Sequence, residues 1–243
     1  MIVFVHGVPE TAQLWDRMRA EIGDESTAVS LPGFGCERPA GFSATKDAYS
    51  EWLAGELEKI GEPVDLVGHD WGAGLTLRIA MTRSDLLRSW ALDVANIFHP
   101  DYEWHDFAKI WQSEEGESFF ETQNATPPEQ RAALFEGFGV PADDALVMAR
   151  AGDKTMGDCI LALYRSATPN PYAHWGADAK PTKAPGLVLI PTEDPFGDEK
   201  MAGEVAEMLG ARTARLEGLG HWWPVQDPRA GADALKAFWS SLT

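Results

Sequence analysis

Six short apolar runs alternate with helix-like stretches along most of the chain. The runs are rich in Val, Ile and Leu, and they lie at residues 2–5, 27–31, 64–67, 89–94, 186–190 and 212–216. Apolar residues at helical spacing cover residues 11–22, 47–60, 73–84, 200–209 and 229–239. Strands that are apolar on both faces and separated by helices are typical of a parallel, doubly wound α/β sheet. We therefore expect one such sheet, with helices on both faces and ligands at the carboxyl ends of its strands.

The alternation is interrupted between residues 98 and 179. This stretch combines many acidic side chains with aromatic ones, and its apolar positions follow helical spacing. Prolines at 127, 128, 169 and 171 divide it. The sequence thus predicts a helical lid at residues 98–179, inserted between two strands of a core formed by residues 1–97 and 180–243.

The stretch at residues 66–74, LVGHDWGAG, follows an apolar strand and leads into a helix. This is the context of a nucleophile elbow, in which a sharp turn aims its central side chain into a pocket. Gly68 and Gly72 would allow the tight turn, and Asp70 occupies the central position. The alternative is that Asp70 only caps the following helix.

A carboxylate at the elbow predicts a different reaction from the usual serine. Serine forms an acyl-enzyme with esters and amides, whereas a carboxylate attacks an electrophilic carbon and leaves an ester on the enzyme. Asp70 therefore indicates alkyl halides or epoxides as substrates.

A general base is expected near the C-terminus. His221 lies in the glycine-flanked loop GLGHWW after the last apolar run, and so follows the nucleophile in the chain order typical of this motif. It would activate the water that hydrolyses the ester. Asp194 and Asp93 each follow a predicted strand, and either could orient the imidazole. We favour Asp194, and Asp93 remains open.

Other candidate site residues surround these. The amides of Val8, in the turn HGVP, and of Trp71 could form an oxyanion hole. The Trp71 indole N–H could hold a halide, or the ring could simply pack under the lid. The Tyr164 phenol could protonate an epoxide oxygen, or it could be a satisfied lid aromatic.

Composition narrows the partners and the location. The 243 residues are 44% hydrophobic and carry a formal net charge of −18, which disfavours nucleic acid and anionic membranes as partners. No apolar run approaches the ~20 residues needed to span a bilayer. The first residues lack the features of a secretory signal, and two cysteines are too few for a disulfide framework, so we expect a cytoplasmic protein. No Cys/His spacing indicates a metal site.

Five motifs in order resemble the α/β-hydrolase superfamily, and more narrowly its Asp-nucleophile branch of epoxide hydrolases and dehalogenases. They are HGVPE at 6–10, GHDWG at 68–72, YRSA at 164–167, TEDPF at 192–196 and GHWW at 220–223. The resemblance implies Asp70 as nucleophile, His221 as base and an acid whose strand varies within the family. Family members usually have two further strands before the HG turn. The turn begins here at His6, so we expect those edge strands to be missing and the sheet to have about six strands, fewer than the usual eight.

The resemblance also defines the expected lid residues. Epoxide hydrolases of this branch use two lid tyrosines. Tyr164 matches one, while the position of the other falls on Phe107, for which Tyr102 could substitute. Many haloalkane dehalogenases carry Asn where Val8 stands, so Trp104 or Trp111 would have to supply their second halide donor.

These observations predict a hydrolase that needs no cofactor and acts on a small apolar electrophile, as a monomer or homodimer. Epoxide hydrolysis to a diol is the favoured reaction. Hydrolytic dehalogenation is the alternative, and a non-catalytic, lidded ligand-binding protein is the third hypothesis.

Overall fold

The computed structural model describes residues 1–23 and 25–242 and contains one six-stranded parallel sheet. The strands are β1 (Ile2–Val5), β2 (Ser26–Val29), β3 (Val64–Gly68), β4 (Leu87–Leu92), β5 (Gly186–Pro191) and β6 (Arg212–Leu216). Their order across the sheet is β2-β1-β3-β4-β5-β6, and every neighbouring pair is parallel. The predicted fold class and the expected strand number are confirmed.

The register of the central strands aligns the loops that carry chemistry. Val5 pairs with Gly68, and Gly68 pairs with Leu92, so β1, β3 and β4 end on one line. The next residues along the chain, His6, His69 and Asp93, therefore leave the sheet side by side. The candidate site lies at this edge of the sheet.

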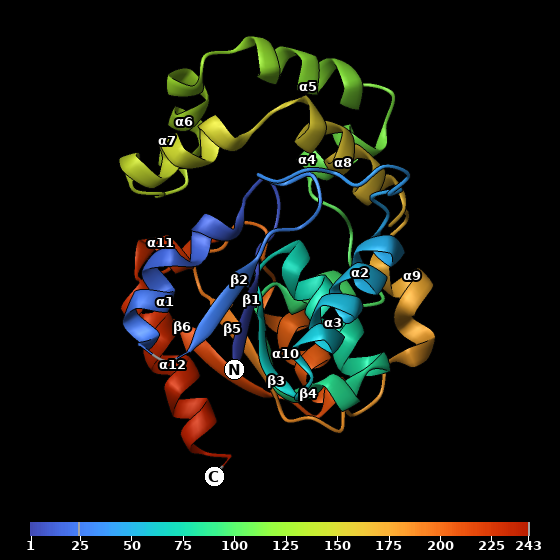
Figure 1. Ribbon diagram of the computed structural model, residues 1–243, viewed down its shortest axis with the longest axis vertical. Coiled ribbons are helices and arrows are strands. Elements are labelled where there is room, and N and C mark those ends of the chain that lie inside the picture. The colour runs from blue at the N-terminus through green and yellow to red at the C-terminus, as the bar shows by residue number, and fades with distance from the viewer. Residues whose placement is uncertain (24, 243) are drawn as a thin grey trace.

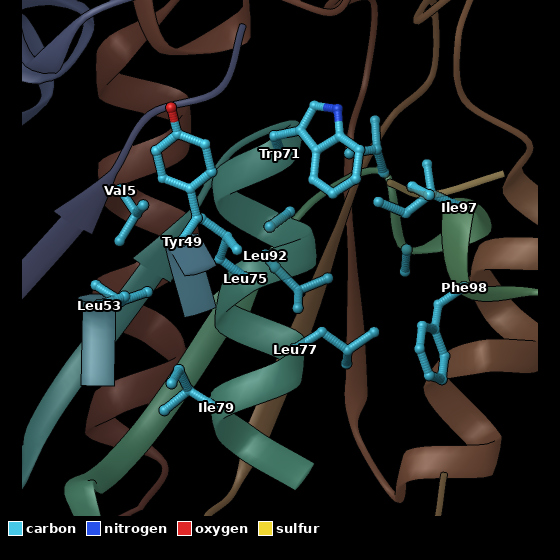
Figure 2. Close-up of a cluster of buried hydrophobic side chains, with 14 of the residues drawn as sticks. Val5, Tyr49, Leu53, Trp71, Leu75, Leu77, Ile79, Leu92, Ile97 and Phe98 are labelled. Atoms are coloured by element: carbon cyan, nitrogen blue, oxygen red, sulfur yellow. The ribbon is translucent and has the colours of Figure 1, made fainter. Parts of the chain in front are cut away.

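Two apolar cores cover the two faces of the sheet. On one face lie α2 (Lys46–Ile60), α3 (Trp71–Thr82) and α10 (Glu199–Leu209). Figure 2 shows part of this core, where Leu75 of α3 lies near Tyr49 of α2 and Leu77 of α3 points toward Phe98. On the other face α1 (Asp16–Ile22) packs against α12 (Pro228–Ser240), beside α11 (Trp223–Gln226).

Several element boundaries differ from the predictions, and α3 begins and ends two residues earlier than the helix expected at 73–84. The expected helix at 11–22 begins as the 3₁₀ turn η1 (Ala12–Trp15) before α1. The strand expected at 27–31 ends at Val29, because its only neighbour, β1, ends at Val5, which pairs with Val29. The strand expected at 89–94 is shifted to Leu87–Leu92, because Val64 at the start of β3 pairs with Leu87.

Six helices are inserted between β4 and β5. They are α4 (Asp106–Gln112), α5 (Gly116–Ala125), α6 (Pro128–Gly137), α7 (Ala142–Ala151), α8 (Lys154–Arg165) and α9 (Pro171–Trp175). The 3₁₀ turns η3 (Ala95–Phe98) and η4 (Gly176–Asp178) lie at the two ends of this insertion, and η2 (Ser84–Leu86) precedes β4. Helices α4 to α8 lie over the carboxyl ends of the strands (Figure 1). Helix α9 lies beside the core, where the Arg78 guanidinium of α3 is 5.4 Å from the Trp175 ring centroid. The division into core and lid domains stays a prediction.

Within the described chain, none of the helices is long and apolar enough to span a bilayer.

Candidate active site

Asp70 stands on a strained turn between β3 and α3. Its backbone has φ 50° and ψ −120°, a conformation that non-glycine residues rarely adopt. A Cβ on Gly68 would collide with the backbone of Gly72, and one on Gly72 would collide with the backbone of Val5. A Cβ on Gly7 would collide with the Asp70 side chain itself. Glycine at these three positions lets the turn fit tightly against β1.

One carboxylate oxygen of Asp70 is held and the other is not. The Val8 amide donates a hydrogen bond of 2.8 Å to Oδ1. Trp71 is the first residue of α3, so its amide lies at the helix N-terminus next to Asp70. Burial raises the pKa of Asp70 to about 6, against the lowering effect of His221. The free oxygen, Oδ2, faces the histidine.

His221 is buried between two carboxylates. Its Nδ1 lies 2.9 Å from Oδ2 of Asp194, and its Nε2 lies 3.9 Å from Oδ2 of Asp70. Burial alone would lower the pKa of His221, but the charge and hydrogen bond of Asp194 raise it above its usual value. The Phe196 amide donates to Oδ1 of Asp194, which fixes the carboxylate on its loop. The geometry is that of a nucleophile, a base and an orienting acid.

Asp93, the other acid considered, bonds to different groups. Its Oδ2 lies 2.5 Å from Nδ1 of His69 and accepts a hydrogen bond of 2.6 Å from the Trp223 indole. Its Oδ1 accepts the Asp70 amide at 3.0 Å. Asp93 thus holds the elbow backbone and His69, and the His221 imidazole pairs with Asp194.

A buried ion triplet of Glu10, His69 and Asp93 lies behind Asp70. Glu10, which sequence reasoning missed, places Oε1 3.2 Å from Nε2 of His69, opposite Asp93. It also accepts hydrogen bonds from the Trp222 indole and the Gly7 amide. The two carboxylates hold the pKa of His69 well above its usual value although burial opposes this. His69 in turn contributes to a Glu10 pKa of about 2, again against burial.

The ligand atoms of Glu10, His69 and His221 lie within 4.8 Å of one another, close enough to suggest a metal site. However, both nitrogens of His69 already face carboxylate oxygens, so that imidazole has no lone pair to offer a cation. Glu10 and His69 are better described as members of the ion triplet with Asp93, which lies next to His221.

His6 links the loop after β1 to the loop after β2. Its Nε2 accepts the Leu31 amide at 3.1 Å, so the ring proton sits on Nδ1 and is donated to the Gly7 carbonyl at 2.8 Å. Burial lowers the pKa of His6 to about 4, which keeps the ring neutral. This is a structural role.

A cavity opens from Asp70 toward the inserted helices. Asp70, His221, Tyr164, Phe107 and Trp111 all line it, and most of the remaining wall is apolar. An apolar wall with a few polar groups is typical of a site for a small organic ligand.

Tyr164 stands over the nucleophile end of this cavity. It is 1% exposed, and burial together with the Asp70 charge raises the pKa of its phenol well above the usual value. Its ring lies against both Trp71 and Trp111, with centroids 5.5 and 4.8 Å away. The phenol therefore keeps its proton in a largely apolar cage.

The five other expected lid and floor residues differ in their hydrogen bonding and packing. Trp71 and Trp111 have buried Nε1 atoms for which the described residues provide no hydrogen-bond partner. The Trp104 indole instead donates to the Ala167 carbonyl, and its ring stacks on Trp71. Tyr102 packs against Trp104 at 5.3 Å, and Phe107 lies in the cavity wall.

His105 is a cavity residue that sequence reasoning did not select. Its Nδ1 accepts the Ala108 amide at the start of α4, so the proton of the neutral ring resides on Nε2. Burial lowers the pKa of His105 to about 4, which keeps it neutral at physiological pH. The cap position before α4 was the one sequence signal available.

Comparison with known proteins identifies a family whose model matches this chain. The family model described as the alpha/beta hydrolase family matches residues 2–234. Haloalkane dehalogenase 2 of Mycobacterium bovis is 25% identical over 220 residues, covering 88% of this chain and 68% of that protein.

Two solved structures have a similar fold. An epoxide hydrolase of Bacillus megaterium superposes with a TM-score of 0.80 at 18% identity, covering 98% of this chain and 93% of that one. The haloalkane dehalogenase DbeA of Bradyrhizobium elkani superposes with a TM-score of 0.75 at 18% identity, covering 99% and 90%. At such low identity, the likeness shows a common fold.

Proposed function

This chain belongs to the alpha/beta hydrolase family and is a hydrolase of that type, and we propose that it hydrolyses epoxides through an ester on Asp70. One observation carries the choice of epoxides. The protonated phenol of Tyr164 lines the same cavity as the Asp70 carboxylate, where an epoxide oxygen needs a proton donor.

In the first step, Oδ2 of Asp70 attacks one epoxide carbon while the Val8 amide holds Oδ1. The bond from that carbon to the ring oxygen breaks, and the oxygen takes the Tyr164 proton. The product is a hydroxyalkyl ester of Asp70 and a tyrosinate. The Nε2–H group of His105 is a second donor in the cavity and can stabilise the developing alkoxide. It would take the role of the second lid tyrosine, which was expected at the position of Phe107 or from Tyr102.

In the second step, His221 removes a proton from water, whose oxygen attacks the Asp70 carbonyl carbon. The amides of Val8 and Trp71 stabilise the tetrahedral oxyanion. On collapse, the leaving alkoxide takes the proton from His221 and departs as the diol. The proton of the new Asp70 carboxyl group passes to the tyrosinate, which restores the Asp70 carboxylate. Asp194 orients His221 and stabilises its cation.

Dehalogenation is the second candidate, and the unpartnered indoles of Trp71 and Trp111 favour it. Indole N–H groups are suitable donors to a departing halide. However, the Tyr164 ring contacts both indoles, and no halide chemistry requires its hydroxyl there.

The test is intact-protein mass spectrometry on His221→Gln mixed with epoxides and alkyl halides. Without the base, the ester should accumulate. An adduct with the mass of the whole epoxide supports our proposal, and an alkyl adduct without halogen supports dehalogenation. Asp70→Asn should give neither. If no compound labels His221→Gln and the wild type turns over neither class, Asp70 is not the nucleophile of this chemistry.

A further inference from the structure

The cavity runs along one face of α8. The residues at 153, 156, 157, 160 and 164 all line it, and this spacing places them on one side of the helix. Tyr164 is at the nucleophile end, and Asp153 is the N-cap at the other. At the usual helical rise, eleven residues span about 16 Å, on the order of a dozen extended carbon–carbon bonds.

The end of the cavity away from Tyr164 contains an arginine. Arg131 of α6 lines the cavity and donates from Nη1 to the Gly152 carbonyl at the C-terminal end of α7. Its Nε is buried, and nothing within residues 1–23 and 25–242 accepts a hydrogen bond from it. A buried guanidinium N–H without an acceptor is costly. Because Arg131 lines the cavity, its charge would attract an anion bound there.

The other charges at this end do not neutralise Arg131. Asp153 also lines the cavity, but its Oδ1 is engaged as the N-cap of α8, where it accepts the Met156 amide at 2.8 Å. The amides of Gln123 and Asn124 line the same cavity and add further donors. In a chain with net charge −18, one arginine on an apolar wall marks a local site for an anion.

We propose that the substrate is an amphiphile with a carboxylate at one end, bound by Arg131, and an epoxide about a dozen carbons away, held between Tyr164 and Asp70. The apolar chain between them lies along α8, against Met156 and Ile160. Arg131 is then the residue that selects the length and charge of the substrate. This inference rests on the proposed function.

The test compares three epoxides with wild-type enzyme at neutral pH: a terminal epoxide of a straight-chain acid of about a dozen carbons, its methyl ester, and styrene oxide. A charge-assisted contact predicts a kcat/KM for the acid roughly 10- to 100-fold above that for the ester, expressed mainly in KM. Arg131→Gln should bring this ratio close to one. The control Arg150→Gln, which changes an exposed arginine of α7 that pairs with Glu129, should leave the ratio unchanged.

Inhibition by dodecanoate gives a measurement that needs no variant. Dodecanoate should inhibit wild-type turnover of styrene oxide at least about tenfold more strongly than dodecanol does. Equal inhibition, or an acid-to-ester ratio near one in the wild type, overturns the inference while leaving epoxide hydrolysis intact. Failure to turn over all three epoxides would instead overturn the proposed function.

Discussion

The Nε2 atom of His221 lies 3.9 Å from Oδ2 of Asp70, so the two side chains interact by charge without a direct hydrogen bond. The interaction changes during the proposed reaction. When Asp70 becomes an ester it loses its charge, and one of the influences that raise the pKa of His221 disappears. The imidazole becomes easier to deprotonate at the step in which it has to act as a base.

The same pair predicts the pH dependence of ester formation. Asp70 must be ionised to attack, and its pKa is about 6, so the single-turnover rate should fall as the pH drops below that value. His221 lowers the pKa of Asp70, so His221→Gln should move this limb to higher pH. Stopped-flow tryptophan fluorescence across pH would measure both profiles. A limb near pH 4 in both proteins would mean that Asp70 is not buried as described.

The two candidate acids should give different phenotypes. Asp194→Asn removes the partner of Nδ1 of His221, so ester hydrolysis should slow by about 10²- to 10⁴-fold while ester formation persists. The ester should then be visible by intact mass. Asp93→Asn should instead lower the stability of the fold, since it breaks a buried contact with His69. Ester accumulation in a stable Asp93→Asn protein, but not in Asp194→Asn, would reverse the assignment.

The ion triplet predicts an effect on the stability of the fold. Glu10→Gln leaves the buried, protonated His69 with one carboxylate, and it should lower the free energy of unfolding by about 3–5 kcal/mol. Urea unfolding would measure this. Glu129→Gln is a matched control, because Glu129 is 65% exposed and surface pairs contribute only about 0–1 kcal/mol.

The pH dependence of that effect has a definite sign. The folded pKa of Glu10 is lowered from 4.5 to about 2, so its contribution is present above pH 4.5 and is lost as the pH falls toward 2. The difference between wild type and Glu10→Gln should therefore shrink in acid. A difference that grows in acid would contradict an ionised Glu10.

Much of this architecture could be predicted from the sequence. The alternation of apolar runs predicted the sheet, and GHDWG after a strand predicted the turn at Asp70, since both depend on local pattern. The choice between Asp194 and Asp93 could not be made, because both follow strands at the same edge of the sheet. Only the relative placement of loops decides which carboxylate meets His221.

The missed residues have a common cause. Glu10, His105 and Arg131 carry no local signal of burial, since their types are mostly exposed in proteins. Each is brought to the site by packing between segments distant in sequence. Glu10 meets His69 across 59 positions, and Arg131 meets Gly152 across two helices.

A pair of substitutions in contacting rings separates the two reactions. Tyr164→Phe removes only the phenol oxygen, and it should slow ester formation from epoxides by about 10²- to 10⁴-fold, because the ring oxygen loses its acid. Trp111→Phe removes the unpartnered indole N–H beside it and should affect epoxides far less. Rapid-quench mass spectrometry would measure both rates. For an alkyl halide, Trp111→Phe should slow ester formation more than Tyr164→Phe does, because the leaving halide needs a hydrogen-bond donor and no proton. If Trp111→Phe impairs turnover of the best substrate more than Tyr164→Phe does, the protein is a dehalogenase.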